Sequence, residues 1–390
     1  MRFNKLIYIR YIPLTAKIYK DFYMEEVAQA GIEVEYWDIS ALFFKDTVGQ
    51  EDSSLLTKTR IFNTYKELEE NLIREQPLDD KLFISIMTFE GRVSELYKLF
   101  TKYNCNLAVF GRNMFPLSQQ KISWKFVLEK VNITKIKSYL RTKKIIKEKE
   151  KGLIKPYDIV FLGGKKGWQG IGAISESELS KAEVIKVNSD DYDNALLLKG
   201  SIPIIDTDYI LFLDEYLPLH PDTLLFKIRN VSAEQYYPQL NKYFDLVEKQ
   251  FGIPVVIAAH PKGYRYKGEN FFNSRKVIFG KVSELTEHSY FVLAHDSTSI
   301  NYPIAFGKKL HFITSFNISK YINRVHRNVV SYADFLGCNW QWFDKEDRIN
   351  LVAEIPKQDY QKYKFDFQTS PETENKLSKD IFLEFLKNGQ

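Results

Sequence analysis

The sequence predicts an α/β fold with two Rossmann-like domains. Short apolar runs of the kind found in strands buried on both faces alternate with helical patterns along most of the 390 residues. The connections are short, which implies right-handed crossovers and parallel sheets. The length suffices for two hydrophobic cores. We therefore expect an N-terminal domain over residues 1–225 and a C-terminal domain over 226–390, facing each other across an interdomain cleft.

The first half of the chain supplies one sheet. Runs of β-branched and aromatic residues predict strands at 6–10, 34–37, 82–87, 107–110, 157–162 and 184–187. Helical spacing predicts helices over 15–30, which Gly31 ends, and over 92–103. Arg10, Tyr11 and Thr15 follow the first strand, and they indicate either a substrate-facing edge or a solvated loop.

The second half supplies another sheet by the same reasoning. Strands are expected at 209–213, 255–259, 276–279, 290–294 and 310–313, the last of which closes the sheet. Helices are expected over 232–250, 282–287 and 300–307. From about residue 319 onward the sequence predicts helices and loops, with an amphipathic helix at 372–387.

The stretch His260-Pro261-Lys262 ends the most apolar of these strands. Proline cannot donate a ladder hydrogen bond, so the chain must leave the sheet there. This places His260 and Lys262 at the carboxyl end of a parallel strand, where open α/β sheets bind ligands. The alternative is a histidine that only satisfies its own loop.

The run Ser297-Thr298-Ser299 ends the 290–294 strand and opens a helix that Gly307 stops. Ser297 or Thr298 suits the N-cap of that helix. Hydroxyls and a helix N-terminus both stabilise anions. Together with His260 and Lys262 the run predicts a phosphate site, although helix capping alone would also explain it.

The pair Asp214-Glu215 follows the 209–213 strand. A carboxylate at the exit of a buried strand is costly unless it has a partner or a task. Asp214 is therefore the candidate for the reactive carboxylate, with an Asp that caps the next turn as the alternative. Asp206 and Asp208 precede that strand, and the acidic residues at 190–193 crowd a polar turn, so no metal is expected.

Two further segments have a distinctive composition. Gly163-Gly164-Lys165-Lys166 begins a stretch with five glycines in ten residues, which predicts a mobile, substrate-lining loop or a plain flexible turn. Residues 121–155 hold twelve Lys or Arg and three Glu, with apolar residues at helical spacing. Such a helix can lie on an anionic membrane surface, or it can pack its apolar face on its own domain.

The overall composition is that of a globular protein without a membrane span. It is 44% hydrophobic and 27% charged, and no apolar run approaches the ~18 residues that a bilayer requires. The formal net charge of +5 is too weak to indicate a nucleic-acid partner. Cys105 and Cys338 make neither a disulfide framework nor a metal cluster, which fits a cytoplasmic protein.

The His260-Pro261 pair, the Ser297-Thr298-Ser299 run and the upstream acidic pair together resemble the signatures of bacterial GT-B glycosyltransferases that use CMP-sugars. These include sialyltransferases, polysialyltransferases and the Kdo transferases of capsule and lipopolysaccharide assembly. Tyr216 stands where the sialyltransferase motif usually has glycine. The chain is more similar to the Kdo enzymes, in length and in the Leu-Pro-Leu-His-Pro-Asp continuation after the acidic pair.

The resemblance implies specific roles for these residues. His260, Pro261, Lys262, Ser297, Thr298 and Ser299 would hold the donor phosphate. Asp214 and Glu215 in the N-terminal acceptor domain, together with His260 in the C-terminal domain, would carry the chemistry, without a metal or cofactor. The partners would be a CMP-sugar and a glycan or lipid-linked glycan acceptor, at the inner face of a membrane.

Two alternatives belong to other classes. One is a polyol-phosphate transferase similar to the CDP-glycerol enzymes of teichoic acid synthesis, which also have a His-Pro and a serine-rich element. The other is a non-enzymatic glycan or nucleotide binder. This hypothesis would be favoured if the Asp214→Asn variant kept its function in the cell.

Overall fold

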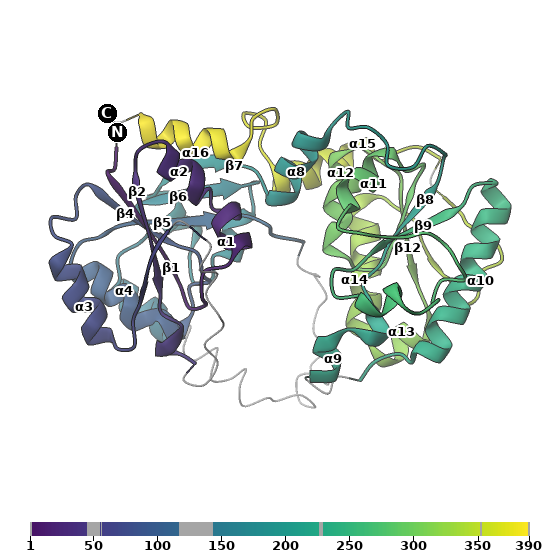
Figure 1. Cartoon of the computed structure of the whole chain (residues 1–390), viewed down its shortest axis with the longest axis horizontal. Helices are drawn as coiled ribbons and strands as arrows, with labels where there is room; N and C mark the ends of the chain where they lie inside the picture. The colour runs from purple at the N-terminus through teal and green to yellow at the C-terminus, as the bar shows by residue number, and fades with distance from the viewer. Residues whose placement is uncertain are drawn as a thin grey trace. The chain divides into compact units, whose positions relative to one another are not determined.

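The computed structural model describes residues 2–44, 55, 57–116, 143–225, 229–351 and 353–388 (Figure 1). Within these, residues 2–114, 143–190 and 366–388 form one compact unit, and residues 191–365 form a second. Each unit contains one parallel sheet with helices on its faces. The expected α/β class with two Rossmann-like sheets is confirmed.

The first unit has a seven-stranded sheet in the order β3-β2-β1-β4-β5-β6-β7, and every pairing is parallel. Its strands are β1 (Lys5–Arg10), β2 (Glu33–Asp38), β3 (Lys58–Ile61), β4 (Lys81–Ser85), β5 (Asn106–Gly111), β6 (Ile159–Gly163) and β7 (Glu183–Val187). β3 is absent from the sequence expectation because only Ile61 among its four residues is apolar, and that side chain is exposed.

The helices of the first unit cover both faces of this sheet (Figure 1). They are α1 (Ala16–Asp21), α2 (Met24–Gln29), α3 (Tyr65–Arg74), α4 (Ser94–Lys102), a helix at 143–150, α7 (Glu176–Leu179) and α16 (Ser378–Lys387). The single helix expected over 15–30 is two helices, because Tyr23 adopts a left-handed conformation with φ 58°. Thr15 caps the first of them by accepting a hydrogen bond from the Ile18 amide.

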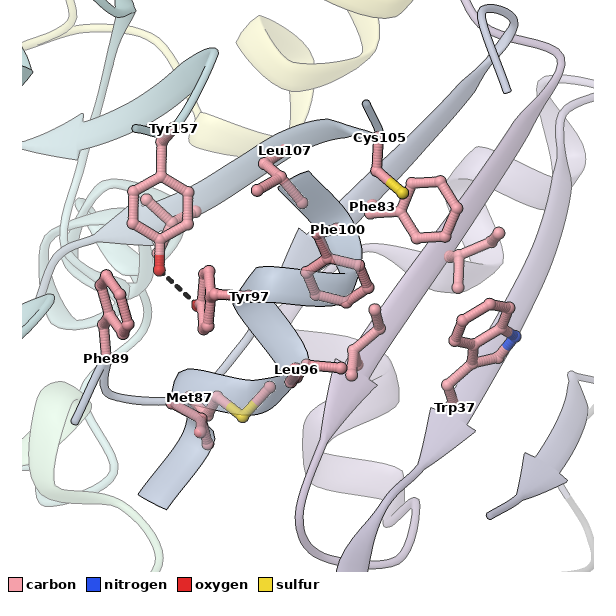
Figure 2. Close-up of a cluster of buried hydrophobic side chains, with 14 of the residues drawn as sticks. Trp37, Phe83, Met87, Phe89, Leu96, Tyr97, Phe100, Cys105, Leu107 and Tyr157 are labelled. Carbon is pink, nitrogen blue, oxygen red and sulfur yellow. Dashed lines mark hydrogen bonds between the residues drawn. The ribbon is translucent and has the colours of Figure 1, made fainter. Parts of the chain in front are cut away.

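Aromatic side chains fill the core on one face of this sheet (Figure 2). Phe89 stacks on Tyr97 with ring centroids 4.1 Å apart, and the Tyr97 hydroxyl bonds that of Tyr157. Trp37 packs against Phe83 further along the sheet. These buried rings rigidify the strands whose carboxyl ends are considered below.

The C-terminal segment returns to the first unit. In α16, Phe382, Phe385 and Leu386 are buried on the other face of the sheet, and the Phe161 ring contacts both phenylalanines. Figure 1 shows α16 lying along this sheet near α2. The expectation that the terminal helices complete the C-terminal domain is wrong, because the apolar face of α16 is buried in the first unit.

The second unit has a six-stranded sheet in the order β10-β9-β8-β11-β12-β13, again all parallel. Its strands are β8 (Ile210–Leu213), β9 (Val255–Ala259), β10 (Val277–Phe279), β11 (Val292–Ala294), β12 (Leu310–Thr314) and β13 (Trp340–Trp342). Its helices are α8 (Asp190–Leu198), α9 (Pro221–Leu225), α10 (Ala233–Phe251), α11 (Val282–His288), α12 (Asn301–Ala305), α13 (Phe316–Tyr321), α14 (Asn323–Leu336) and α15 (Lys357–Tyr363).

Three expectations for this region are corrected. The domain boundary at 225 lies within the second unit, because β8 pairs with β9 and β11. β12 does not close the sheet, since β13 pairs with it. The acidic residues at 190–193 lie in the first turn of α8 rather than in a polar turn. Carboxylates there interact favourably with the positive end of the helix dipole.

The basic segment is described only from residue 143, so 121–142 lie outside the described residues. In the helix at 143–150, Lys143, Lys144 and Lys147 are exposed, and we call them the lysine cluster. Ile145 is buried in the core of the first unit. None of the helices in the described ranges is long and apolar enough to cross a bilayer. Both cysteines are buried and form no disulfide.

Candidate functional site

Each sheet has one point at which its strand order reverses, where open α/β sheets bind ligands beyond the carboxyl ends of the strands. In the second unit this switch point lies between β8 and β11. β8 leads into Asp214-Glu215, and β11 leads into His295-Asp296-Ser297. β9, on the other side of β8, leads into His260. The sequence therefore identified residues at the carboxyl edge of this sheet.

His260 is held in one protonation form by its own loop. Its Nδ1 accepts a hydrogen bond from the Lys262 amide at 3.2 Å, so in the neutral ring the proton is on Nε2. Burial lowers the pKa of His260, and the nearby charges of His220 and Lys262 lower it further. The half-buried ring is thus neutral at pH 7, with an Nε2–H available as a donor.

Two residues that the sequence analysis had not selected complete this corner. The His220 ring meets the His260 ring edge-on, with centroids 5.0 Å apart. Asp222 lies 3.0 Å from Lys262 Nζ and lowers the local positive charge. His220 belongs to a second His-Pro dipeptide after β8, His220-Pro221, which repeats the pattern of His260-Pro261, and Asp222 follows it directly. That repetition was the available signal for them.

Asp214 connects the ends of two strands. Its Oδ2 accepts from the His260 amide at 3.2 Å, and its Oδ1 accepts from the Tyr216 amide and the Tyr266 hydroxyl, both at 3.1 Å. Burial raises the pKa of Asp214 to about 6, although these hydrogen bonds oppose the shift. Asp214 was expected in the N-terminal domain, opposite the donor site. That placement is wrong, since it lies in the second unit and directly supports His260.

Glu215 and Asp296 form a second acidic feature, at the switch point itself. Burial raises the pKa of Glu215 well above its usual range, and the charge of Asp296 and a hydrogen bond to its carboxyl raise it further. Asp296 Oδ2 accepts from Arg324 at 3.0 Å and from Asn328 at 2.8 Å. Glu215 Oε1 and Asp296 Oδ1 are buried, and no residue in the described part satisfies them with a hydrogen bond. Burial beside a second acidic group therefore favours the protonated form of Glu215.

The Ser297-Thr298-Ser299 run lies at the same sheet edge as His260, but no hydrogen bond joins the two within the described residues. β9 and β11 flank β8, so about 10 Å separates their ends at normal strand spacing. Ser297 is the N-cap of a 3₁₀ turn, Thr298–Ile300, that leads into α12, and its hydroxyl accepts from the Ser299 amide at 3.2 Å. Ile300, not Ser297 or Thr298, is the N-cap of α12 itself. Thr298 is exposed, and the acidic residues lie between the two halves.

His295 belongs to the framework of this edge. It is fully buried, and its Nδ1–H donates to the Ile313 carbonyl while Nε2 accepts from the Tyr236 hydroxyl. Burial lowers the pKa of His295 to about 4. Within the described residues, no group of three or more His, Cys, Asp or Glu side chains could hold a metal ion.

The glycine-rich loop is packed in the first unit. A Cβ on Gly164 would lie 2.7 Å from the Phe367 backbone, and one on Gly167 would lie 2.1 Å from the Gly111 carbonyl oxygen. Gly163 is equally enclosed. Lys166 forms an ion pair with Asp366 at 2.9 Å, whereas Lys165 is exposed. Close backbone packing therefore accounts for these glycines, and the segment expected to be a mobile loop instead packs against the C-terminal segment around residues 366–367.

No protein-family model and no curated protein matches the chain. Solved structures similar to it include the UDP-GlcNAc 2-epimerase from Methanocaldococcus jannaschii, at 12% identity over 98% of this chain and 100% of that chain, with TM-score 0.47. A variant of the wall teichoic acid polymerase TagF has 12% identity, coverage of 98% and 89%, and TM-score 0.48. The calicheamicin glycosyltransferase CalG4 has 10% identity over 100% of this chain and 96% of that chain, with TM-score 0.41. Such distant likenesses carry no argument about function.

Proposed function

We propose that the chain is a GT-B glycosyltransferase that transfers Kdo or a related nonulosonic acid from a CMP-sugar to a surface polysaccharide. In this proposal the donor phosphate binds at the carboxyl edge of the second sheet. The observation that carries it is the state of His260: a neutral ring whose Nε2–H is directed by its own loop, beside Lys262 and next to a switch point.

These groups suit the departure of a nucleotide. The acceptor oxygen attacks the anomeric carbon, the bond from that carbon to the phosphate oxygen breaks, and CMP leaves with the electron pair. Negative charge then grows on the phosphate. A prepositioned N–H donor is worth about 3 kcal/mol or more in comparable oxyanion sites. His260 Nε2–H and Lys262 would supply this stabilisation, with the Ser297-Thr298-Ser299 hydroxyls further along the edge.

The acidic residues at this edge do not exclude an anion. Asp214 is buried, and three hydrogen-bond donors satisfy its carboxylate. Burial raises the pKa of Glu215 and favours its neutral form, which lowers the negative charge at this edge. Arg324 offsets that remaining charge from 3.0 Å.

The same pair is the best candidate for proton transfer. Two neighbouring acidic side chains can supply an acid and a base. We assign to Glu215 and Asp296 the acceptance of the proton that the acceptor hydroxyl loses. Asp214, which the sequence selected for this role, becomes a positioning residue for His260, and His260 becomes a hydrogen-bond donor to the phosphate.

Calorimetry with CMP tests the donor site. Wild type should bind CMP, and His260→Ala should weaken binding about tenfold or more, because it removes a hydrogen bond to a charged group. His288→Ala is the matched control, since His288 ends α11 before β11 and lies at the opposite edge of this sheet. Absence of CMP binding by the wild type would overturn the proposal.

The donor assay separates the two transferase hypotheses. Incubation with CMP-Kdo and with CDP-glycerol, each with a glycan acceptor, should release nucleotide from CMP-Kdo. Release from CDP-glycerol alone would replace the sugar transferase with the polyol-phosphate transferase. The same edge would serve both, because each reaction expels CMP.

A further inference from the structure

The first unit contains a cavity at its own switch point. The strand order reverses between β1 and β4, and a cavity of about 490 Å³ opens beyond the carboxyl ends of these strands and of β5. Its lining includes Arg10 and Tyr11 after β1, Thr88 after β4, and Arg112 and Asn113 after β5. The cavity is thus built by elements of the first unit alone.

The charged groups of this cavity leave one arginine unmatched. Lys17 pairs with Asp21 at 2.7 Å, and Arg112 pairs with Asp190 at 2.9 Å. The half-buried side chain of Arg10 makes no hydrogen bond or ion pair with any described residue. The lining therefore carries a net positive charge, and Arg10 is the group that supplies it.

Arg112 forms a rigid part of the cavity lining. Its guanidinium donates to the Tyr23 hydroxyl at 2.8 Å and lies over the rings of Phe22 and Phe110, with centroid distances of 5.2 and 4.8 Å. Asp190, which pairs with it, also accepts from the Asn113 side chain at 2.6 Å. A cavity with fixed walls loses little conformational entropy when a ligand binds.

The size and lining of the cavity specify a class of ligand. Its volume falls within the range of about 300–1,000 Å³ that is typical of small-molecule sites, so it exceeds the needs of a lone inorganic anion. Phe22, Phe110 and Ile171 offer apolar surface, while Thr88 is an exposed hydroxyl. A guanidinium binds phosphate and carboxylate with two parallel hydrogen bonds.

We propose that this cavity binds a small organic anion, a phosphomonoester or a carboxylate attached to a polar ring, and that Arg10 recognises its charge. The site is built by residues of the first unit, whereas the donor edge belongs to the second sheet. It does not depend on the transferase proposal, because it rests on the cavity, its charge and its position in the fold.

Ligand-detected NMR and calorimetry on the full chain test this inference. The probes are ribose 5-phosphate, glucuronate and neutral ribose, each at millimolar concentration and constant ionic strength. At least one of the two anions should bind, and ribose should not. Arg10→Gln should weaken anion binding about tenfold or more, as expected for losing a charged hydrogen-bonding group. The two anions distinguish a phosphate ligand from a carboxylate ligand.

Arg74→Gln is the matched control, since this exposed arginine on α3 does not line the cavity. It should bind the anion as the wild type does, and so should His260→Ala, whose change lies in the second unit. Thermal unfolding should show that Arg10→Gln is folded. Failure of both anions to bind, equal binding of ribose, or undiminished binding by Arg10→Gln would each overturn the inference.

Discussion

Replacing Asp214 by Asn tests whether this buried carboxylate supports the second sheet. The pKa of Asp214 is raised to about 6 in the folded chain, against a usual value of 3.8. The folded state therefore binds the proton more tightly than the unfolded state, and stability falls as pH rises between these two values. Over the whole range the shift corresponds to about 3 kcal/mol.

The substitution changes two contributions with different pH dependence. Asn has an oxygen that can accept from the Tyr216 amide and the Tyr266 hydroxyl, but its NH₂ group cannot accept from the His260 amide. This mismatch costs about 1–3 kcal/mol at every pH. In the wild type, burial of the charged carboxylate lowers stability only at higher pH, where Asp214 is ionised. Asn carries no charge and removes this cost. The variant should thus be clearly less stable at pH 5 and closer to wild type at pH 7.5.

Urea unfolding at several pH values measures this difference. The wild type should lose about 1.4 kcal/mol relative to Asp214→Asn between pH 5 and pH 7.5, given one pKa near 6. Hydrogen exchange of peptides from β8 and β9 assigns the effect to the second sheet. A stability difference that is the same at both pH values would refute a raised pKa for Asp214. Unchanged exchange at the His260 amide would refute its positioning role.

Three further predictions concern the first unit. Gly167→Ala should destabilise by about 1–3 kcal/mol in thermal unfolding, because its Cβ would clash with the Gly111 carbonyl oxygen, whereas Gly268→Ala, with open space around it, should change little. Phe382→Ala should cost about 3–5 kcal/mol by leaving a core cavity, and the exposed Glu384→Ala should not; equal melting temperatures would contradict the docking of α16. Reversing the charges of the lysine cluster should reduce binding to anionic liposomes in low salt, and equal sedimentation with vesicles would dismiss the membrane contact.

The sequence predicted the buried strands well, because their apolar runs are continuous. β9 begins and ends where its five small and β-branched residues do. It missed two of the four edge strands, β3 and β13, although it predicted the other two, β7 and β10. β3 is polar, and β13 consists of three residues that place Trp340 and Trp342 on a partly exposed face. Such strands are specified by pairing with a neighbour, which a local pattern does not contain.

The same limit applies to the site. The sequence located the strand ends that carry His260 and Ser297, because the breaks after the apolar runs are unambiguous. It assigned Asp214 to the wrong domain, since the strand order of a sheet cannot be deduced from the order of strands along the chain. The pairing of Glu215 with Asp296 depends on β8 lying beside β11, a contact between residues about eighty positions apart.

The return of the C-terminal segment has a consequence for biosynthesis. The Arg2 amide donates to the Leu386 carbonyl at 3.0 Å, so the earliest and latest parts of the described chain are neighbours in one core. During translation the ribosome releases residues 191–365 before α16 exists. The second unit is then able to fold while the first still lacks a helix that covers its sheet, which reverses the usual order in which the N-terminal domain matures first.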